Sequence, residues 1–337
     1  MGGIVLIKYL DFKSKKEFSN TQIIPALLKV GLYSKARKLK TCGNYSEVAV
    51  CTDCHSAHFA GATSCKDKFC PICQKKRSLL WLTKMIPICN DLLDKGYHLN
   101  MLTYTIRTTE DMSLKQCLDF LYNGFRYMTH DDKVSSKQYY DLIIGGVRSL
   151  EVKMGEDKVT KQSTNKWHPH FHILVCTRNE KRYEDLHKLL YDMWNKSLNV
   201  VNHTQGLDLG GIDIKSIKAK NNQTMLDALC EVFKYMTKFD WQGDKVYELV
   251  TTMHKVKMQN SFGNFRNLIK DQEIEVEMNK TYTEIEKNFC SVCGNDEFAI
   301  ATVMYNKNLQ LYDLSNKYSS LKTTDLILHE YMESENG

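Results

Sequence analysis

The segment from residue 167 to residue 175, WHPHFHILV, restricts the fold more than any other part of the sequence. In an extended strand alternate side chains share a face, so His170 and His172 lie on one face and Phe171 lies on the other. Two imidazoles at this spacing converge on one point, and neutral imidazole is the commonest metal ligand in proteins. The alternative is a solvated edge strand with polar side chains. The pair, with His168 as a third imidazole, favours a metal site on a strand.

The segments around this strand alternate between strand-like and helix-like patterns. β-Branched and aromatic residues, or apolar residues at helical spacing, distinguish the two kinds. We predict strands at residues 101–106, 143–154 and 212–217 and helices at residues 114–128 and 183–198. The order strand, helix, strand, strand, helix, strand predicts an α+β fold. Its core is expected to be a ferredoxin-like antiparallel sheet with helices on one face.

Six cysteines near the amino terminus indicate a structural zinc module. They are Cys42, Cys51, Cys54, Cys65, Cys70 and Cys73. The spacing C-x2-C-x15-C-x2-C from Cys51 to Cys73 is typical of a four-thiolate zinc site. Cys42 and Cys65 could replace the pair Cys51 and Cys54, so the choice of ligands stays open. Metal binding would supply the folding energy of a segment too short to bury enough surface.

Positive charge is concentrated in the first part of the chain. Residues 1–86 contain 15 Lys and Arg against 5 Asp and Glu, whereas the remaining residues contain 31 against 35. Such an asymmetry indicates a landing surface for a polyanion, and a merely solvated basic face explains the charge equally well. Lys75, Lys76 and Arg77 follow Cys73 at the start of a predicted amphipathic helix. They are therefore the candidate phosphate-binding residues, although a zinc module in a protein–protein contact is the competing interpretation.

A second group of polar residues falls on a predicted helix that includes residues 229–238. At 100° per residue, Glu231, Tyr235 and Lys238 share the face opposite the apolar stripe. Glu231 and Tyr235 are neighbours at i and i+4, which places a carboxylate near a phenol. Taken alone, this pattern favours an ordinary solvated helix face over a functional site.

Glu151 completes the predicted metal site. On the strand 143–154 it points to the face opposite Leu150 and Val152, so it can face His170 and His172. Two histidines and one carboxylate leave coordination positions for substrate oxygens. A metal held in this way polarises a phosphoryl oxygen, which suits phosphodiester chemistry. A tyrosine, with a free pKa near ~10, needs activation by a base or a metal to attack phosphorus.

Taken together, these motifs resemble those of a known superfamily. His170-Phe171-His172 resembles the histidine–hydrophobe–histidine (HUH) motif of single-strand endonucleases, in the form found in single-tyrosine rolling-circle replication initiators of small bacterial plasmids. Further segments are similar in order: residues 65–73, 102–105, 149–152, 231–238 and 262–265. The resemblance covers about residues 40–270, and the joint order of motifs is more specific than any single motif.

The resemblance implies an origin-specific DNA endonuclease and strand transferase. Tyr235 would attack the scissile phosphate, keep the 5′ end as phosphotyrosine and leave a 3′-OH primer, and Glu231 would activate water to end the round. Lys238 would contact a phosphate or the metal-bound group, with an ordinary helix-surface lysine as the equal alternative. Mn²⁺ or Mg²⁺ would be held by His170, His172, Glu151 and His168, with Zn²⁺ in the cysteine module. The expected partners are single-stranded or supercoiled origin DNA and the host helicase and polymerase. An HUH transposase or relaxase, and a non-catalytic zinc-dependent nucleic-acid binder, are the alternatives.

The chain is long enough for two or three domains. We predict a basic arm and zinc-binding module at 1–92, a nicking domain at 93–245 and an accessory region at 246–337, where the role of Cys290 and Cys293 stays open. No run approaches the ~18 apolar residues of a membrane span, and no cleavage signal follows the amino terminus. A cytoplasmic protein without membrane contact is therefore expected. A homodimer is left open.

Overall fold

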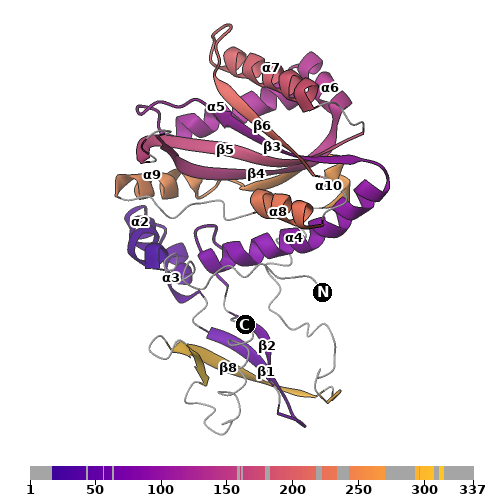
Figure 1. Cartoon of the computed structure of the whole chain (residues 1–337). Coiled ribbons are helices and arrows are strands. Elements are labelled where there is room, and N and C mark those ends of the chain that lie inside the picture. Colours follow the sequence, from indigo (N-terminus) through magenta and orange to yellow (C-terminus); the bar gives the residue numbers. More distant parts are fainter. Residues whose placement is uncertain are drawn as a thin grey trace. The chain divides into compact units, whose positions relative to one another are not determined.

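The computed structural model describes residues 17–42, 45–55, 57–62, 64–157, 160, 162–178, 183–217, 222–233, 243–269, 293–295, 297–306 and 311–314. They belong to two compact units (Figure 1). One is formed by Met1–Gln74 with Val276–Gly337, and the other by Lys75–Glu275. No helix in the described part of the chain is both long and apolar enough to cross a membrane.

The second unit is built on a five-stranded antiparallel sheet. Its strands are β3 (His98–Ile106), β4 (Ile143–Glu156), β5 (Ser163–Thr177), β6 (Gly210–Ile217) and β7 (Gln259–Gly263). The order across the sheet is β6-β3-β5-β4-β7, with every neighbouring pair antiparallel. The first four positions have the arrangement of a split β-α-β ferredoxin-like sheet, and β7 extends it at the β4 edge. The predicted α+β fold with an antiparallel sheet is confirmed.

Helices lie on both faces of this sheet. Figure 1 shows α5 (Leu114–Arg126), α6 (Lys133–Leu142) and α7 (Tyr183–Val201) on one side and α8 (Asn222–Phe233) on the other. The single helical layer expected from the sequence corresponds to α5, α6 and α7. The second layer covers a face of the sheet that would otherwise be exposed, because β5 is buried on both faces. Phe171 and His172 point in opposite directions and are 0% and 6% exposed.

Aromatic packing fixes the helices on each face. On the α5 side, the ring of Phe171 makes edge contacts with Tyr122 and Phe125, with centroids 5.0 and 5.5 Å apart. On the other side, Trp81 of α4 (Pro71–Asp94) stacks on Phe233 at the end of α8, with centroids 5.2 Å apart and planes 9° apart. Both rings of this pair are buried. Such burial of large rings contributes several kcal/mol and holds α8 in place.

Local sequence signals set the ends of the α5 and α6 helices. Ser113 and Gln116 form a capping box at the start of α5, and Asp132 caps α6 by accepting from the backbone N–H groups of Val134 and Ser135. A π-helical segment, η2 (Tyr127–Asp131), separates the two helices. The second unit also contains α9 (Asp244–Met253) and α10 (Phe265–Leu268).

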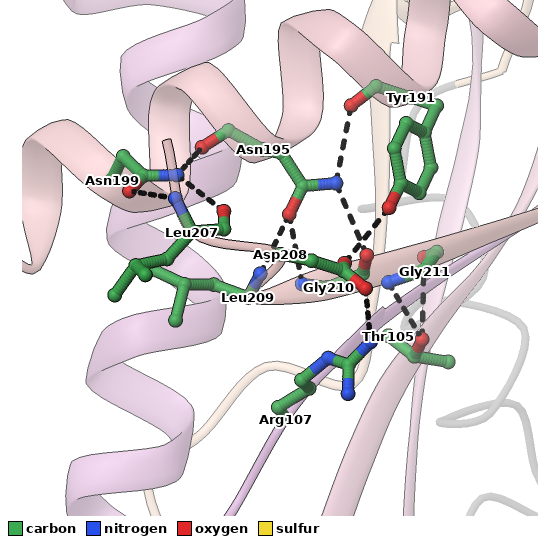
Figure 2. A network of polar contacts seen from close by, with 10 residues as sticks. All are labelled: Thr105, Arg107, Tyr191, Asn195, Asn199, Leu207, Asp208, Leu209, Gly210 and Gly211. Atoms are coloured by element: carbon green, nitrogen blue, oxygen red, sulfur yellow. Dashed lines mark hydrogen bonds and ion pairs between the residues drawn. The ribbon is translucent and has the colours of Figure 1, made fainter. Parts of the chain in front are cut away.

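A polar network holds the connection between α7 and β6 (Figure 2). The Asn195 carboxamide accepts from the N–H groups of Leu209 and Gly210 at 2.8 and 3.0 Å and donates to the Gly210 carbonyl at 3.1 Å. The Asn199 carboxamide likewise donates to the Leu207 carbonyl at 2.7 Å and accepts from the Leu207 N–H at 3.0 Å. The two side chains replace backbone partners that a loop lacks. They therefore fix where the edge strand β6 begins.

The first unit combines segments from both ends of the chain. It contains η1 (Ser19–Ile23), α2 (Ile24–Lys29), α3 (Tyr33–Thr41), β1 (Tyr45–Cys51), β2 (Ala57–Ala62), β8 (Phe298–Asn306) and β9 (Leu311–Leu314). The sheet order is β2-β1-β8-β9, and β1 pairs antiparallel with β8. This grouping differs from the predicted divisions at residues 92 and 245, because pairing between distant strands has no local sequence signature.

Candidate active site and metal-binding clusters

Three buried side chains meet on the face of the sheet that α8 covers. Strand pairing places Glu151 of β4 opposite His170 of β5. Glu151 Oε2 lies 2.8 Å from His170 Nε2 and 2.9 Å from His172 Nε2, and the two Nε2 atoms are 3.1 Å apart. The three residues are between 3% and 6% exposed. The alternation of β5 and the antiparallel register thus bring two imidazoles and one carboxylate to a single point.

The geometry of this triad fits a divalent metal ion. Donors bonded at right angles to one ion at ~2.1 Å lie about 3.0 Å from one another. The three separations of 2.8, 2.9 and 3.1 Å match one face of such an octahedron. Two unprotonated imidazole nitrogens this close repel each other unless a cation lies between them. The donor set is therefore suited to a metal with further positions open for oxygen ligands.

Hydrogen bonds on the far sides of the rings orient both histidines. His170 Nδ1 donates to the carbonyl of His168 at 3.2 Å, and because a carbonyl only accepts, Nε2 keeps its lone pair. His172 Nδ1 lies 3.1 Å from the Thr103 hydroxyl on the neighbouring strand β3, which can accept its proton. Such outer partners fix the tautomer that binds a metal. The sequence argument missed Thr103, although alternation in the strand 101–106 places it on the histidine face.

Burial favours the neutral form of His170 and of His168. It lowers the pKa of His170, and its effect exceeds the opposing effect of the Glu151 carboxylate. Burial and the neighbouring His170 lower the pKa of His168 to about 4. Neutral imidazole is the form that binds metals.

A carboxylate from α8 approaches the triad. Glu231 Oε1 lies 3.8 Å from His172 Nε2, and the Glu231 side chain is 39% exposed. Glu231 and Glu151 approach the histidines from different directions. Glu231 belongs to α8, which lies over the sheet, whereas Glu151 belongs to a strand of the sheet. Glu231 is thus next to the triad and still accessible to solvent.

A four-cysteine cluster lies in the first unit. The sulfur atoms of Cys42, Cys65, Cys70 and Cys73 all lie within 4.8 Å of one another. Cys73 Sγ is 3.6 Å from both Cys42 Sγ and Cys65 Sγ. Thiolates bonded tetrahedrally to Zn²⁺ at ~2.3 Å are about 3.8 Å apart. The backbone N–H groups of Cys65 and Lys66 donate to Cys42 and Cys73 sulfur at 3.3 and 3.2 Å, which stabilises thiolates.

Comparison with known proteins identifies the family. The model of a family described as Replication protein matches residues 56–308, which is more than half of the chain. The chain belongs to this family. The resemblance to plasmid replication initiators predicted from the motifs is confirmed at this level.

Three proteins named Protein rep are among the relatives of this replication protein. One from a Bacillus species is 26% identical over 232 residues, which are 64% of this chain and 70% of the relative. One from Streptococcus pneumoniae serotype 2 (strain D39) is 24% identical over 301 residues, 83% of this chain and 84% of the relative. One from Bacillus amyloliquefaciens is 26% identical over 196 residues, 55% and 52% of the two chains. No solved structure matches the chain significantly.

The structure of this replication protein brings together some of the predicted site residues and separates others. Among the described residues, His168 is not in the triad: its ring centroid lies 5.4 Å from that of His170, and it contributes its backbone carbonyl instead. The ring is offset because it belongs to the next pleat of the strand. Tyr235 and Lys238 lie outside the described residues, so their roles stay predictions.

The predicted zinc ligands divide into two groups. Cys70 and Cys73 group with Cys42 and Cys65, which is the alternative that the sequence left open, whereas Cys51 and Cys54 group with Cys293. The longer C-x2-C-x15-C-x2-C set is therefore not brought together at one point. The reason is that Cys51 ends the strand β1 and is carried away from the start of α4.

The predicted DNA-binding residues follow the four-cysteine cluster directly. Lys75, Lys76 and Arg77 occupy the first turns of α4, two to four residues after Cys73. The side chains of Lys76 and Arg77 are half-buried. The predicted position at the start of a helix is confirmed, and contact with DNA stays a prediction.

Proposed function

We propose that this chain initiates rolling-circle replication of a plasmid by nicking one strand of the origin DNA. The observation that supports it is the triad Glu151, His170 and His172 with Glu231 beside it, in a chain of the replication protein family. The sheet and α8 hold these groups at one point, as cleavage of a phosphodiester requires. The alternative of a zinc-dependent DNA binder gives the triad no role.

The proposed nucleophile is Tyr235, two residues beyond the last described residue of α8. The phenol loses its proton to water, its oxygen attacks the scissile phosphorus, and the bond from phosphorus to the 3′ oxygen breaks. The released oxygen takes a proton from water to become the 3′-OH primer, so no net proton is gained or lost. The phosphate remains bonded to Tyr235 at the 5′ end, so the number of phosphoester bonds is unchanged. This permits the strand to be passed later to another hydroxyl. Lys238 would bind a non-bridging phosphate oxygen.

Glu151, His170 and His172 would hold Mn²⁺ or Mg²⁺, because oxygen and imidazole donors with open positions suit these ions. A bound ion would withdraw electron density from the phosphoryl oxygen and orient the phosphate. Glu231, which is partly exposed, would accept the proton of a water molecule that ends the round by attacking the phosphotyrosine. Lys75, Lys76 and Arg77 would bind the DNA backbone. A host helicase would unwind the duplex, and a host polymerase would extend the 3′ end.

A covalent-adduct assay tests this proposal. The full chain is incubated with Mn²⁺ and a labelled single-stranded oligonucleotide from the replicon that encodes it, and denaturing gels separate adducts. Tyr235→Phe should abolish the adduct, whereas the control Tyr33→Phe, at an exposed position of α3, should not. His170→Ala should also abolish it, whereas His130→Ala, at a side chain 80% exposed, should not. A Tyr235→Phe protein that still forms the adduct would reject the proposed nucleophile.

A further inference from the structure

A second group of cysteines lies in the first unit, apart from the four-cysteine cluster. The sulfur atoms of Cys51, Cys54 and Cys293 lie within 4.8 Å of one another, and those of Cys51 and Cys293 are 3.5 Å apart. None of the three takes part in a disulfide among the described residues. Cys51 ends β1, and Cys293 lies shortly before β8, the strand that pairs with β1. The pairing of the two strands thus brings together cysteines from opposite ends of the chain.

The turns that present these cysteines have an unusual backbone conformation. His55, directly after Cys54, has a φ of 59°, and Gly294, directly after Cys293, has a φ of 80°. In the four-cysteine cluster Lys66, directly after Cys65, also has a positive φ, 58°, and its N–H donates to Cys73 sulfur. A positive φ is disfavoured for His and Lys and persists only where the surroundings require it. In both clusters, therefore, a residue with a positive φ directly follows a cysteine.

Hydrogen bonds join the two cysteine-bearing loops to each other. Asn295 Nδ2 donates to the Thr52 hydroxyl at 3.1 Å and lies 3.8 Å from Cys51 Sγ. Thr52 donates through both its N–H and its hydroxyl to the carbonyl of Glu297, at 3.2 and 3.3 Å. The Asn295 amide supplies a donor to sulfur, as a metal-bound thiolate prefers. The loops are thus held in the position at which the three thiols converge.

We propose that Cys51, Cys54 and Cys293 bind a second Zn²⁺, whose role is to fasten the carboxy-terminal strands to β1. The 3.5 Å separation of the Cys51 and Cys293 sulfur atoms is close to the ~3.8 Å edge of a tetrahedral zinc–thiolate site, and thiolates select zinc over magnesium or manganese. In the sequence Cys290 and Cys293 also have the Cys-x2-Cys spacing typical of zinc sites. This inference does not depend on the proposed nicking activity.

The two clusters differ in how accessible they are. Cys54 and Cys293 are exposed, whereas Cys42, Cys70 and Cys73 are buried. A chelator in solution should therefore remove zinc from the second site first. The release of zinc from the wild-type protein should occur in two phases of similar amplitude, measured with a coloured chelator that reports free Zn²⁺.

Zinc content tests the proposal. The full chain, purified under reducing conditions, should contain about two zinc ions, and Cys293→Ser and Cys73→Ser should each leave about one. The control Cys117→Ala, at a buried cysteine of α5 outside both clusters, should keep both ions. If Cys293→Ser retains the zinc content of the wild type, the second site is rejected. Because a variant can fail to fold, the wild-type release curve is the second measurement, and a single phase with about one ion per chain would also reject the site.

Discussion

Glu231 Oε1 lies 3.8 Å from His172 Nε2, although the two residues come from a helix and a strand on different layers of the fold. The distance is too long for a hydrogen bond and short enough for one water molecule to donate to both groups. Glu231 is thus positioned to act on a group bound at the triad.

We expect Glu231→Gln to slow hydrolysis of the covalent adduct without slowing its formation to the same extent. Adduct formation should stay within a few fold of the wild type, while hydrolysis of the adduct should fall by about a hundredfold, the usual loss of a general base. A time course of adduct formation and decay on denaturing gels measures both rates. Glu110→Gln, at an exposed loop position, is the matched control. Unchanged decay of the adduct in Glu231→Gln would rule out this role.

We expect Thr103→Val to weaken metal binding without removing a ligand. The variant removes the group that accepts from His172 Nδ1, and loss of such an outer partner lowers metal affinity by about tenfold or more. Calorimetric titration with Mn²⁺ measures the dissociation constant. Thr251→Val, on the exposed side of α9, should leave it unchanged. Equal affinities for Thr103→Val and the wild type would show that the Thr103 hydroxyl does not orient His172.

Trp81→Ala is expected to loosen α8. It deletes a buried ring that stacks on Phe233, and such a deletion costs about 3–5 kcal/mol of unfolding free energy. Trp81→Phe should lose much less, because it keeps an aromatic partner. Urea unfolding followed by circular dichroism measures the difference. A loss below about 1 kcal/mol for Trp81→Ala would mean that the stack contributes little.

The buried cysteines Cys89, Cys117 and Cys176, which lie outside both cysteine clusters, should react slowly in the folded protein. Burial raises the pKa of Cys89 to about 12 and those of Cys117 and Cys176 to about 11. Alkylation requires the thiolate, so at pH 8 these thiols should be modified much more slowly than after unfolding, with reaction rates rising as the pH approaches their pKa values. Mass spectrometry of peptides after maleimide treatment measures this at each position. Equal rates before and after unfolding would contradict it.

Binding to single-stranded DNA should depend on the basic residues at the start of α4. If Lys76 and Arg77 contact phosphates, each change to Ala should reduce the slope of log K against log salt by about 0.7. Fluorescence anisotropy at several salt concentrations measures the slope. Lys188→Ala, on α7 of the other helical layer, is the control. An unchanged slope in both variants would place the DNA elsewhere.

The sequence alone determined the local geometry of the site. Alternation along β5 was enough to place His170 and His172 on one face, and the same rule oriented Glu151 on β4, because side-chain direction in a strand depends only on position. The order of strands and helices predicted the ferredoxin-like sheet for a similar reason. Short connections and antiparallel pairing leave few ways to join these elements.

The tertiary structure decided which distant residues meet. Cysteine spacing is compatible with several sets of four, and only the course of β1 away from α4 separates Cys51 from Cys73. The pairing of β1 with β8, which brings Cys293 to Cys51, depends on backbone hydrogen bonds that any sequence can form. The approach of Glu231 to His172 likewise results from the packing of Trp81 on Phe233. Such contacts depend on how whole helices and strands bury their surfaces against one another. A local sequence pattern does not determine that packing.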